Sequence, residues 1–330
     1  MNISTTKKEL QSAFSKLTKT TQVKSQNPLV NYTYISSGAH GVTLHSTDME
    51  VGIKTQITAS VNTNGEGLFP TSEVNDIISV IEEGRVDIDI AGPHINIKSE
   101  KGISFDIPTV PFQEYPEIPE NKHEALFTIE TNKLKNIISS LLYAINAEPT
   151  KPALNGAYFN FSQDKIDFVA TDGHRLVKIT RQNETNISQG YIIPKKYLNI
   201  LNTFLEGQKE TSLIFSEDHV FSNNGKDVFY SKIIDEKFPN YNAVIPESNP
   251  EELNAQKTEM LNNIKAASIA TNKNTNQISL NFSEGKVYFK SVNQPESKTV
   301  YAPIKSAEYK GEELAIGFNA LYLKEAVAKY

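Results

Sequence analysis

The sequence predicts an α+β fold in which one module occurs three times in tandem. Three observations predict it: an amphipathic helix recurs at a spacing of roughly 125 residues, a β-hairpin with nearly the same residues recurs as well, and a second helix follows each hairpin. With 330 residues, the chain is also too long for one ordinary core. The modules are expected at residues 1–120, 121–247 and 248–330.

The first helix of each module is predicted from apolar residues at helical spacing. In module one this stripe lies between Thr6 and Leu17, and Thr6 with Glu9 has the pattern of a capping box. The stripes of modules two and three begin near Thr131 and Thr258. The apolar positions are Leu10, Ala13, Phe14 and Leu17, then Leu134, Ile138 and Leu141, then Met260, Ile264 and Ala267.

The hairpin of module two is predicted from two runs of β-forming residues, Tyr158–Phe161 and Ile166–Ala170, joined by a short polar turn. The second run leads into Thr-Asp-Gly-His-Arg-Leu at residues 171–176, where Gly173 permits a backbone conformation that other residues avoid. Segments of the other modules align with this hairpin: Asn281-Phe282-Ser283 with Asn160-Phe161-Ser162, and Ser46-Thr47-Asp48-Met49 with Ala170-Thr171-Asp172-Gly173.

The second helix of each module is expected to start at Phe69-Pro70, Ile193-Pro194 and Phe318-Asn319, because Pro is typical of a first helical turn. Acidic, Pro-containing segments follow Tyr115-Pro116 and Phe238-Pro239 and are typical of linkers. The alternative, surface loops inside one domain, is disfavoured because the repeat restarts there. Module three stops at Tyr330 and is expected to lack at least two strands that its siblings have.

Composition narrows the class of protein. A hydrophobic content of 38% and a charged content of 22% are typical of a soluble globular protein, and no apolar run reaches membrane-spanning length. The N-terminus has no apolar region of a secretion signal, so a cytoplasmic location is expected. The absence of Cys excludes disulfides, thiolate catalysis and Cys-ligated metal. A net charge of -6 argues against a generally basic nucleic-acid binder, unless positive charge gathers on one face.

The chain resembles the family of the bacterial DNA polymerase III β subunit, the sliding clamps. The resemblance rests on Ala-Thr-Asp-Gly-His-Arg-Leu at residues 170–176 and on Leu154-Asn155-Gly156, Pro194-Lys195-Lys196, Phe238-Pro239-Asn240-Tyr241 and Gly317-Phe318-Asn319 with Tyr322. It implies three tandem copies of the DNA-clamp fold in a head-to-tail dimeric ring, with helices on the inner face and β-sheets on the outer face. Two chains of three modules can close such a ring through a heterologous interface that pairs exposed sheet edges.

The function implied by the resemblance is that of a non-catalytic processivity factor without cofactor or metal. Such a homodimer would encircle double-stranded DNA without reading its sequence and would tether the replicative DNA polymerase. A separate ATP-driven clamp loader would open the ring. Other repair and replication proteins with a clamp-binding motif would be further partners.

Lysines on the predicted helices are the expected DNA contacts. A lysine surface binds phosphate loosely and without base readout, which suits a sliding tether. The candidates are Lys8, Lys16, Lys24, Lys133, Lys135, Lys195, Lys196, Lys257 and Lys265. Charge alone favours the alternative that these helix surfaces are Lys-rich for solubility, whereas charge combined with the repeat favours the DNA interpretation.

A peptide-docking cleft between modules two and three is also implied by the resemblance. Its residues, carried over position by position, are Leu154, Thr171, Gly173, His174, Arg175, Leu176, Pro239, Val244, Asn319 and Tyr322. Apolar members would form a floor, and polar members would donate to a peptide backbone or carboxylate. Two alternatives stay open: Arg175 pairs with Asp172 to hold the strand end, and His174 is an ordinary surface histidine.

Two other function classes were weighed against the clamp. An enzyme could use Asp172 and His174 as an acid/base or metal pair, but the six histidines are scattered and the chain has no zinc-helix motif and no Gly-rich phosphate loop. A carbohydrate- or protein-binding β-rich protein is the third class. Such a protein has no need for lysines that recur at the same place on repeated helices.

Overall fold

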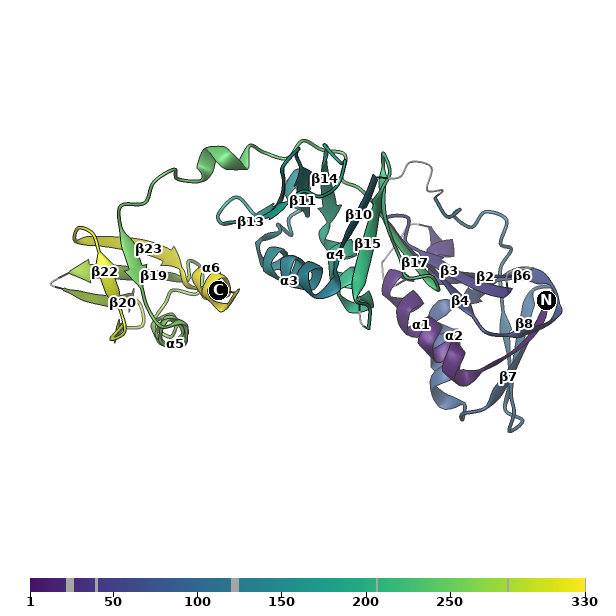
Figure 1. The fold of residues 1–330 in the computed structure, drawn as a ribbon. Helices are drawn as coiled ribbons and strands as arrows, with labels where there is room; N and C mark the ends of the chain where they lie inside the picture. The colour runs from purple at the N-terminus through teal and green to yellow at the C-terminus, as the bar shows by residue number, and fades with distance from the viewer. Residues whose placement is uncertain (22–26, 39–40, 120–124, 206, 284, 330) are drawn as a thin grey trace. The chain divides into compact units, whose positions relative to one another are not determined.

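The computed structural model describes residues 1–21, 27–38, 41–119, 125–205, 207–283 and 285–329. They form two compact units, Met1–Phe238 and Pro239–Tyr330, each of which is described by itself (Figure 1). Unit 1 holds module one and module two up to Phe238, whereas unit 2 holds residues 239–247, which were expected in module two, together with module three. Within these described residues, no helix is long and apolar enough to cross a membrane.

Module one contains two helices, α1 (Lys7–Thr21) and α2 (Thr71–Val80), which pack against each other. Its strands are β1 (Asn2–Thr6), β2 (Tyr32–Gly38), β3 (Gly41–Thr47), β4 (Val51–Ile57), β5 (Ser60–Thr63), β6 (Gly65–Pro70), β7 (Arg85–Ala91), β8 (His94–Ser99) and β9 (Ser104–Pro108), with the 3-10 helix η1 (Pro28–Asn31). The predicted stripe of α1 is buried. Only half of the predicted capping box forms: Thr6 Oγ1 accepts from Glu9 N at 3.2 Å, but the Glu9 carboxylate accepts from Thr58 N instead.

Module two repeats the pattern with α3 (Thr131–Leu141) and α4 (Lys195–Phe204). Its strands are β10 (Ala125–Glu130), β11 (Gly156–Phe161), β12 (Lys165–Thr171), β13 (Leu176–Gln182), β14 (Gly190–Pro194), β15 (Glu210–Phe215), β16 (His219–Asn223) and β17 (Asp227–Lys232), with the 3-10 helices η2 (Leu142–Ala144) and η3 (Pro152–Leu154). The predicted hairpin is β11–β12, and Phe159 pairs with Phe168 across it. Proline stands immediately before α2 and α4, as the helix-start pattern predicted.

A single eight-stranded sheet joins the two modules of unit 1. Its strand order is β10-β15-β16-β17-β4-β3-β2-β6, so β17 of module two pairs antiparallel with β4 of module one. The register runs from Asp227 opposite Thr55 to Ser231 opposite Val51. Two further sheets belong to one module each, β5-β1-β7-β8-β9 to module one and β13-β12-β11-β14 to module two. Backbone pairing therefore fixes how modules one and two are placed.

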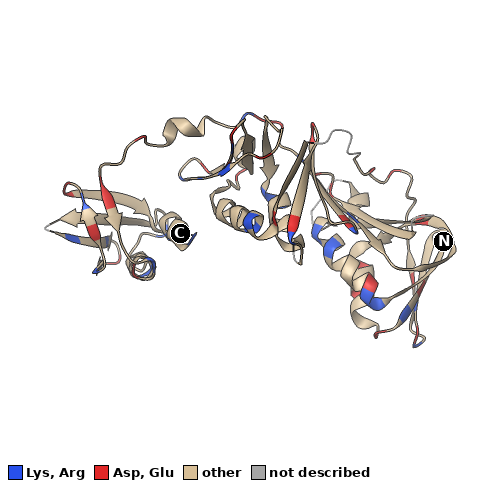
Figure 2. Ribbon diagram, viewed as in Figure 1, with Lys and Arg blue, Asp and Glu red and all other residues tan. Residues whose placement is uncertain are grey.

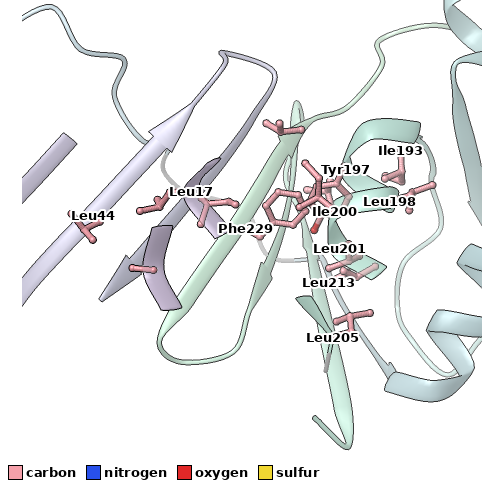
Figure 3. Close-up of a cluster of buried hydrophobic side chains, with 14 of the residues drawn as sticks. Leu17, Leu44, Ile193, Tyr197, Leu198, Ile200, Leu201, Leu205, Leu213 and Phe229 are labelled. Atoms are coloured by element: carbon pink, nitrogen blue, oxygen red, sulfur yellow. The ribbon is translucent and has the colours of Figure 1, made fainter. Parts of the chain in front are cut away.

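A continuous cluster of buried apolar side chains runs through both modules of unit 1. Figure 3 shows the part where α4 faces β17: Tyr197 and Ile200 of the helix lie beside Phe229 of the strand. The rings of Tyr197 and Phe229 are stacked with centroids 4.4 Å apart, and Phe204 stacks on the same ring at 5.4 Å. The helix was predicted from this apolar spacing, and burial of such a face is what stabilises a short helix.

Unit 2 consists of α5 (Lys257–Ser268) and α6 (Ala320–Lys329) against a four-stranded sheet of order β21-β20-β19-β23. Its strands are β18 (Glu252–Asn254), β19 (Gln277–Ser283), β20 (Lys286–Asn293), β21 (Lys298–Pro303), β22 (Glu308–Lys310) and β23 (Leu314–Asn319), and η4 (Tyr241–Val244) precedes them. The predicted hairpin is β19–β20, and Ile264 and Ala267 of the predicted stripe are buried.

Candidate functional site

The turn between β12 and β13 carries most of the predicted peptide-site residues of unit 1. Asp172 Oδ1 accepts hydrogen bonds from the backbone N–H groups of His174 at 2.9 Å and Arg175 at 3.1 Å. Thr171 Oγ1 donates to the Arg175 carbonyl at 2.7 Å and accepts from Gly173 N at 3.1 Å. Gly173 has a φ of +91°, in the left-handed region that favours glycine. The polar hexapeptide therefore folds as a compact turn that fixes its own backbone.

The guanidinium of Arg175 is bound within the protein. Its Nε donates to Asp172 Oδ2 at 2.9 Å, and its Nη2 donates to the carbonyl of Tyr143, whose ring centroid lies 5.0 Å from the guanidinium carbon. The alternative that Arg175 holds the strand end by pairing with Asp172 is thus observed. Both carboxylate oxygens of Asp172 therefore accept hydrogen bonds from within the turn and hold it together.

One predicted residue of unit 1, Leu154, lies outside this turn. Tyr143 contacts the turn through Arg175, and Leu154 at the end of η3 accepts from Asn146 N at 3.0 Å. Thr171 is buried, Leu154 and Leu176 are half-buried, and Gly173 and His174 are exposed. Five of the six predicted residues of unit 1 thus belong to or flank one turn, and Leu154 belongs to the segment that follows Tyr143.

The other four predicted residues belong to unit 2. Asn319 ends β23 and caps α6, because its Oδ1 accepts from Leu321 N at 2.9 Å and Tyr322 N at 3.4 Å. Tyr322 is half-buried in the first turn of that helix, and Pro239 is exposed. Val244 in η4 is 69% exposed, a large exposure for an apolar side chain. Asn319 therefore caps a helix, whereas the sequence analysis had expected it only to contact a partner peptide.

The predicted DNA-contact lysines differ in what they touch. Figure 2 shows blue positions on α1 and α3. Lys8 and Lys265 are exposed and Lys135 is half-exposed, whereas Lys133 pairs with Glu130 at 3.0 Å and Lys257 donates to the Ala328 carbonyl. Lys24 lies outside the described residues. The helices therefore present charge, as predicted, but not from every lysine equally.

Three of the predicted lysines bind groups inside unit 1. Lys16 donates to Asp227 at 2.5 Å, Lys195 donates to the Ile145 carbonyl at 3.0 Å, and Lys196 pairs with Asp48 of module one. Burial lowers the pKa of Lys196. The side chain of Asp48 is only 3% exposed, so Lys196 compensates a buried carboxylate. Sequence reasoning missed Asp48 and Asp227 as partners, although the alignment of Asp48 with Asp172 was a signal.

Family models match the chain along nearly its whole length. The N-terminal domain of the DNA polymerase III beta subunit matches residues 1–119, its central domain matches residues 128–240, and its C-terminal domain matches residues 242–329. The chain belongs to the DNA polymerase III beta subunit family.

Relatives and solved structures of this family extend the match. The chain is 25% identical to a beta sliding clamp of Treponema pallidum over 289 residues, which cover 86% of this chain and 78% of the relative. It is 27% identical to that of Rickettsia felis over 321 residues, with 92% and 84% covered. The fold matches the beta subunit of Pseudomonas aeruginosa at a TM-score of 0.93 and 23% identity, covering all of this chain and 90% of that one. A clamp of Bartonella birtlesii bound to griselimycin matches at 0.92 and 25%, with the same coverage.

Membership of the beta subunit family confirms the α+β fold of three clamp modules that the repeat predicted. The rival interpretation of Asp172 and His174 as metal ligands finds no support in the structure. Across the described residues, no group of three or more His, Asp or Glu side chains is placed to hold a metal ion.

Proposed function

We propose that this chain is a non-catalytic processivity factor that encircles double-stranded DNA and tethers the replicative DNA polymerase to it. The observation that carries the proposal is the match of three clamp-domain models to consecutive parts of one chain, in each of which the first α-helix bears lysines. A tether of this kind keeps the polymerase at a high effective concentration near the primer end, so dissociation no longer ends synthesis.

The assembly proposed is a head-to-tail homodimer, opened on DNA by a separate ATP-driven loader and working in the cytoplasm. Three modules per chain need a second chain to close a ring through repeated contacts. Within the chain, the junction of modules one and two is already a contact between sheet edges, because β17 of module two pairs with β4 of module one in a single sheet. We propose that a comparable edge-to-edge contact closes the ring between chains.

We propose DNA contacts at the lysines named above, and we expect these lysines to contribute unequally to phosphate binding. Lys8, Lys135 and Lys265 offer their charge to solvent and are expected to contribute most to phosphate binding. Lys16 and Lys196 each compensate a carboxylate of unit 1, and their loss is expected to lower stability more than DNA affinity. The net charge of -6 fits a protein whose positive charge is local and weak.

Peptides of polymerase and repair partners are proposed to dock on the turn of residues 171–176 in unit 1 and on Val244 and Tyr322 in unit 2. The exposed Val244 side chain and the rigid turn support this proposal, because a peptide site needs accessible apolar anchors on fixed backbone. Ala243 beside Val244 offers no charge to a partner and is expected to influence partner preference.

Retention on DNA topology tests the function directly. The labelled full chain is loaded onto a nicked circular plasmid with its clamp loader and ATP, and bound protein is separated by gel filtration before and after a restriction cut. Retention on circles and loss after linearisation are expected, because a ring runs off free ends. Equal retention on both forms would contradict the proposal. Sedimentation at several concentrations gives the oligomeric state in parallel.

A further inference from the structure

A cavity of about 680 Å³ lies where modules one and two meet in unit 1. Glu50 and Val51 of module one form one wall, and residues around the start of α4 and the end of β17 form the other. Lys232 N donates to the Glu50 carbonyl at 2.8 Å, directly after the ladder between β17 and β4. Backbone pairing therefore holds the two walls at a fixed separation.

The internal repeat relates this cavity to the proposed peptide-docking residues. The alignment of Asp48 with Asp172 places Glu50 at the position of His174 and Val51 at the position of Arg175. The starts of the second helices place Pro194 at the position of Asn319. Three residues that line the cavity are thus the module-one and module-two counterparts of residues proposed for peptide docking.

The two turns also share their hydrogen bonds. Asp48 Oδ1 accepts from the N–H groups of Glu50 at 3.0 Å and Val51 at 2.9 Å, as Asp172 Oδ1 does from His174 and Arg175. Met49 has a φ of 76° where Gly173 has its positive φ. The equivalence is therefore one of structure as well as of sequence.

The second carboxylate oxygen distinguishes the two turns. Asp172 Oδ2 accepts from Arg175 of its own turn, whereas Asp48 Oδ2 accepts from Lys196 at the start of α4. Lys196 therefore ties the module-one turn to the next module. In place of an arginine, the module-one turn carries Val51, whose side chain is 1% exposed and packs in the core of unit 1.

The chemistry of the lining is apolar with a cationic margin. Pro194, Ile233 and Ile234 are half-buried and supply apolar surface. Lys195, Lys196 and Lys232 also line the cavity, against the single lining carboxylate of Glu50, and Lys232 is exposed. An apolar group beside a carboxylate complements such a lining.

We infer that this cavity is a second peptide-binding site, which takes a short segment with an aliphatic side chain next to an acidic one. The aliphatic group packs against Ile233 and Ile234, and the carboxylate pairs with Lys232 at the margin. This site goes beyond the proposed function, because it lies wholly within unit 1 and needs neither a closed ring nor the residues of unit 2.

The test uses the full chain with labelled Ile, Leu and Val methyl groups and an acetylated Gly-Asp-Leu-Leu-Glu peptide as the probe. Titration is expected to shift the methyl signals of Ile233 and Ile234 in NMR spectra. Lys232→Glu is expected to weaken this response at least tenfold. Lys209→Glu is the matched control, since Lys209 is also an exposed lysine of module two, and it should leave the response unchanged. Asn199→Trp, at an exposed lining position of α4, should block the cavity without disturbing the core.

Two results would overturn the inference. One is a peptide response confined to Leu154, Leu176 and Val244, which would leave only the docking surface proposed above. The other is a response of Ile233 and Ile234 to a short DNA duplex but not to the peptide, which would make the cavity a phosphate site. Retention of Lys232→Glu on circular DNA separates this test from that of the proposed function, because it is expected to equal that of the parent chain.

Discussion

Lys16 of module one donates a hydrogen bond of 2.5 Å to Asp227, which lies 211 positions later in the chain and opens β17 of module two. The carboxylate also accepts from Thr55 Oγ1 at 2.5 Å and from Asn224 Nδ2 at 3.1 Å. Burial opposes ionisation of Asp227, but the hydrogen bonds from Lys16, Thr55 and Asn224 outweigh it and lower the pKa. One carboxylate thus joins α1, β4 and β17.

Replacing this carboxylate should weaken the junction of the two modules. Asp227→Ala leaves three donors without their acceptor in a site where the Asp227 side chain is 5% exposed, so a loss of about 1 to 3 kcal/mol in unfolding free energy is expected. Urea unfolding measures it. A double-mutant cycle with Lys16→Met should show coupling above about 0.5 kcal/mol. Strictly additive effects would mean that the pair contributes nothing of its own.

His45 predicts a dependence of stability on pH. Its Nε2 lies 2.8 Å from Tyr230 Oη, and burial, reinforced by the charge of Lys54, lowers the pKa of the imidazole from 6.5 to about 3. Between these two pH values the unfolded chain binds a proton that the folded chain does not, so unfolding free energy should fall as the pH drops below 6.5. Urea titrations at several pH values measure the slope.

The variant for this pH effect is His45→Gln. Loss of His45 should remove its part of the slope. An unchanged slope in His45→Gln would show that other groups cause the pH dependence.

Tyr197 offers a stabilising substitution. Its ring is fully buried against Phe229, and within the described structure its hydroxyl has no hydrogen-bond partner. Tyr197→Phe removes a desolvated polar atom and keeps the stacking, so unfolding free energy should rise by about 1 kcal/mol. Tyr230→Phe is the control, because it breaks a hydrogen bond to His45 and should lower stability. A loss of stability in Tyr197→Phe would reveal a buried water on the hydroxyl.

A substitution of Val244 tests the proposed docking surface independently of the proposed ring. Val244→Asp should weaken polymerase binding at least tenfold, because it puts a charge on an apolar anchor that is 69% exposed. Val80→Asp is a matched control in module one, since Val80 is 65% exposed. Surface plasmon resonance with immobilised polymerase compares the two, and both variants should stay on circular DNA. Equal binding by both variants would remove Val244 from the site.

Local structure followed from the sequence because its causes are local. The apolar stripes predicted α1, α3 and α5, whose starts lie at or within one residue of the expected positions 6, 131 and 258. The turn at Asp172 was also foreseeable, since an Asp followed by Gly favours a tight turn. The pairing of Arg175 with Asp172 was left open as an alternative to contacts with a peptide, and only the coordinates show that the pair forms.

Contacts across the module junction could not be predicted in this way. Lys196 meets Asp48 from 148 positions away, and nothing in the pattern of α4 distinguishes this lysine from a solvated one. The sequence of neither module predicts that β17 pairs with β4 or in which register, because each module on its own has several sheet edges that could pair. These contacts determine which lysines are available to bind DNA phosphates and where the cavity between modules one and two forms.

The ladder between β4 and β17 also has a consequence for synthesis on the ribosome. Thr55 of β4 contacts Asp227 of β17, 172 positions further along the chain. Strand β4 therefore leaves the ribosome long before β17, with which it pairs, has been synthesised. Until then a finished first module displays an open edge, which is a hazard for pairing with other nascent chains. Translation speed through the second module should therefore govern the yield of properly assembled protein.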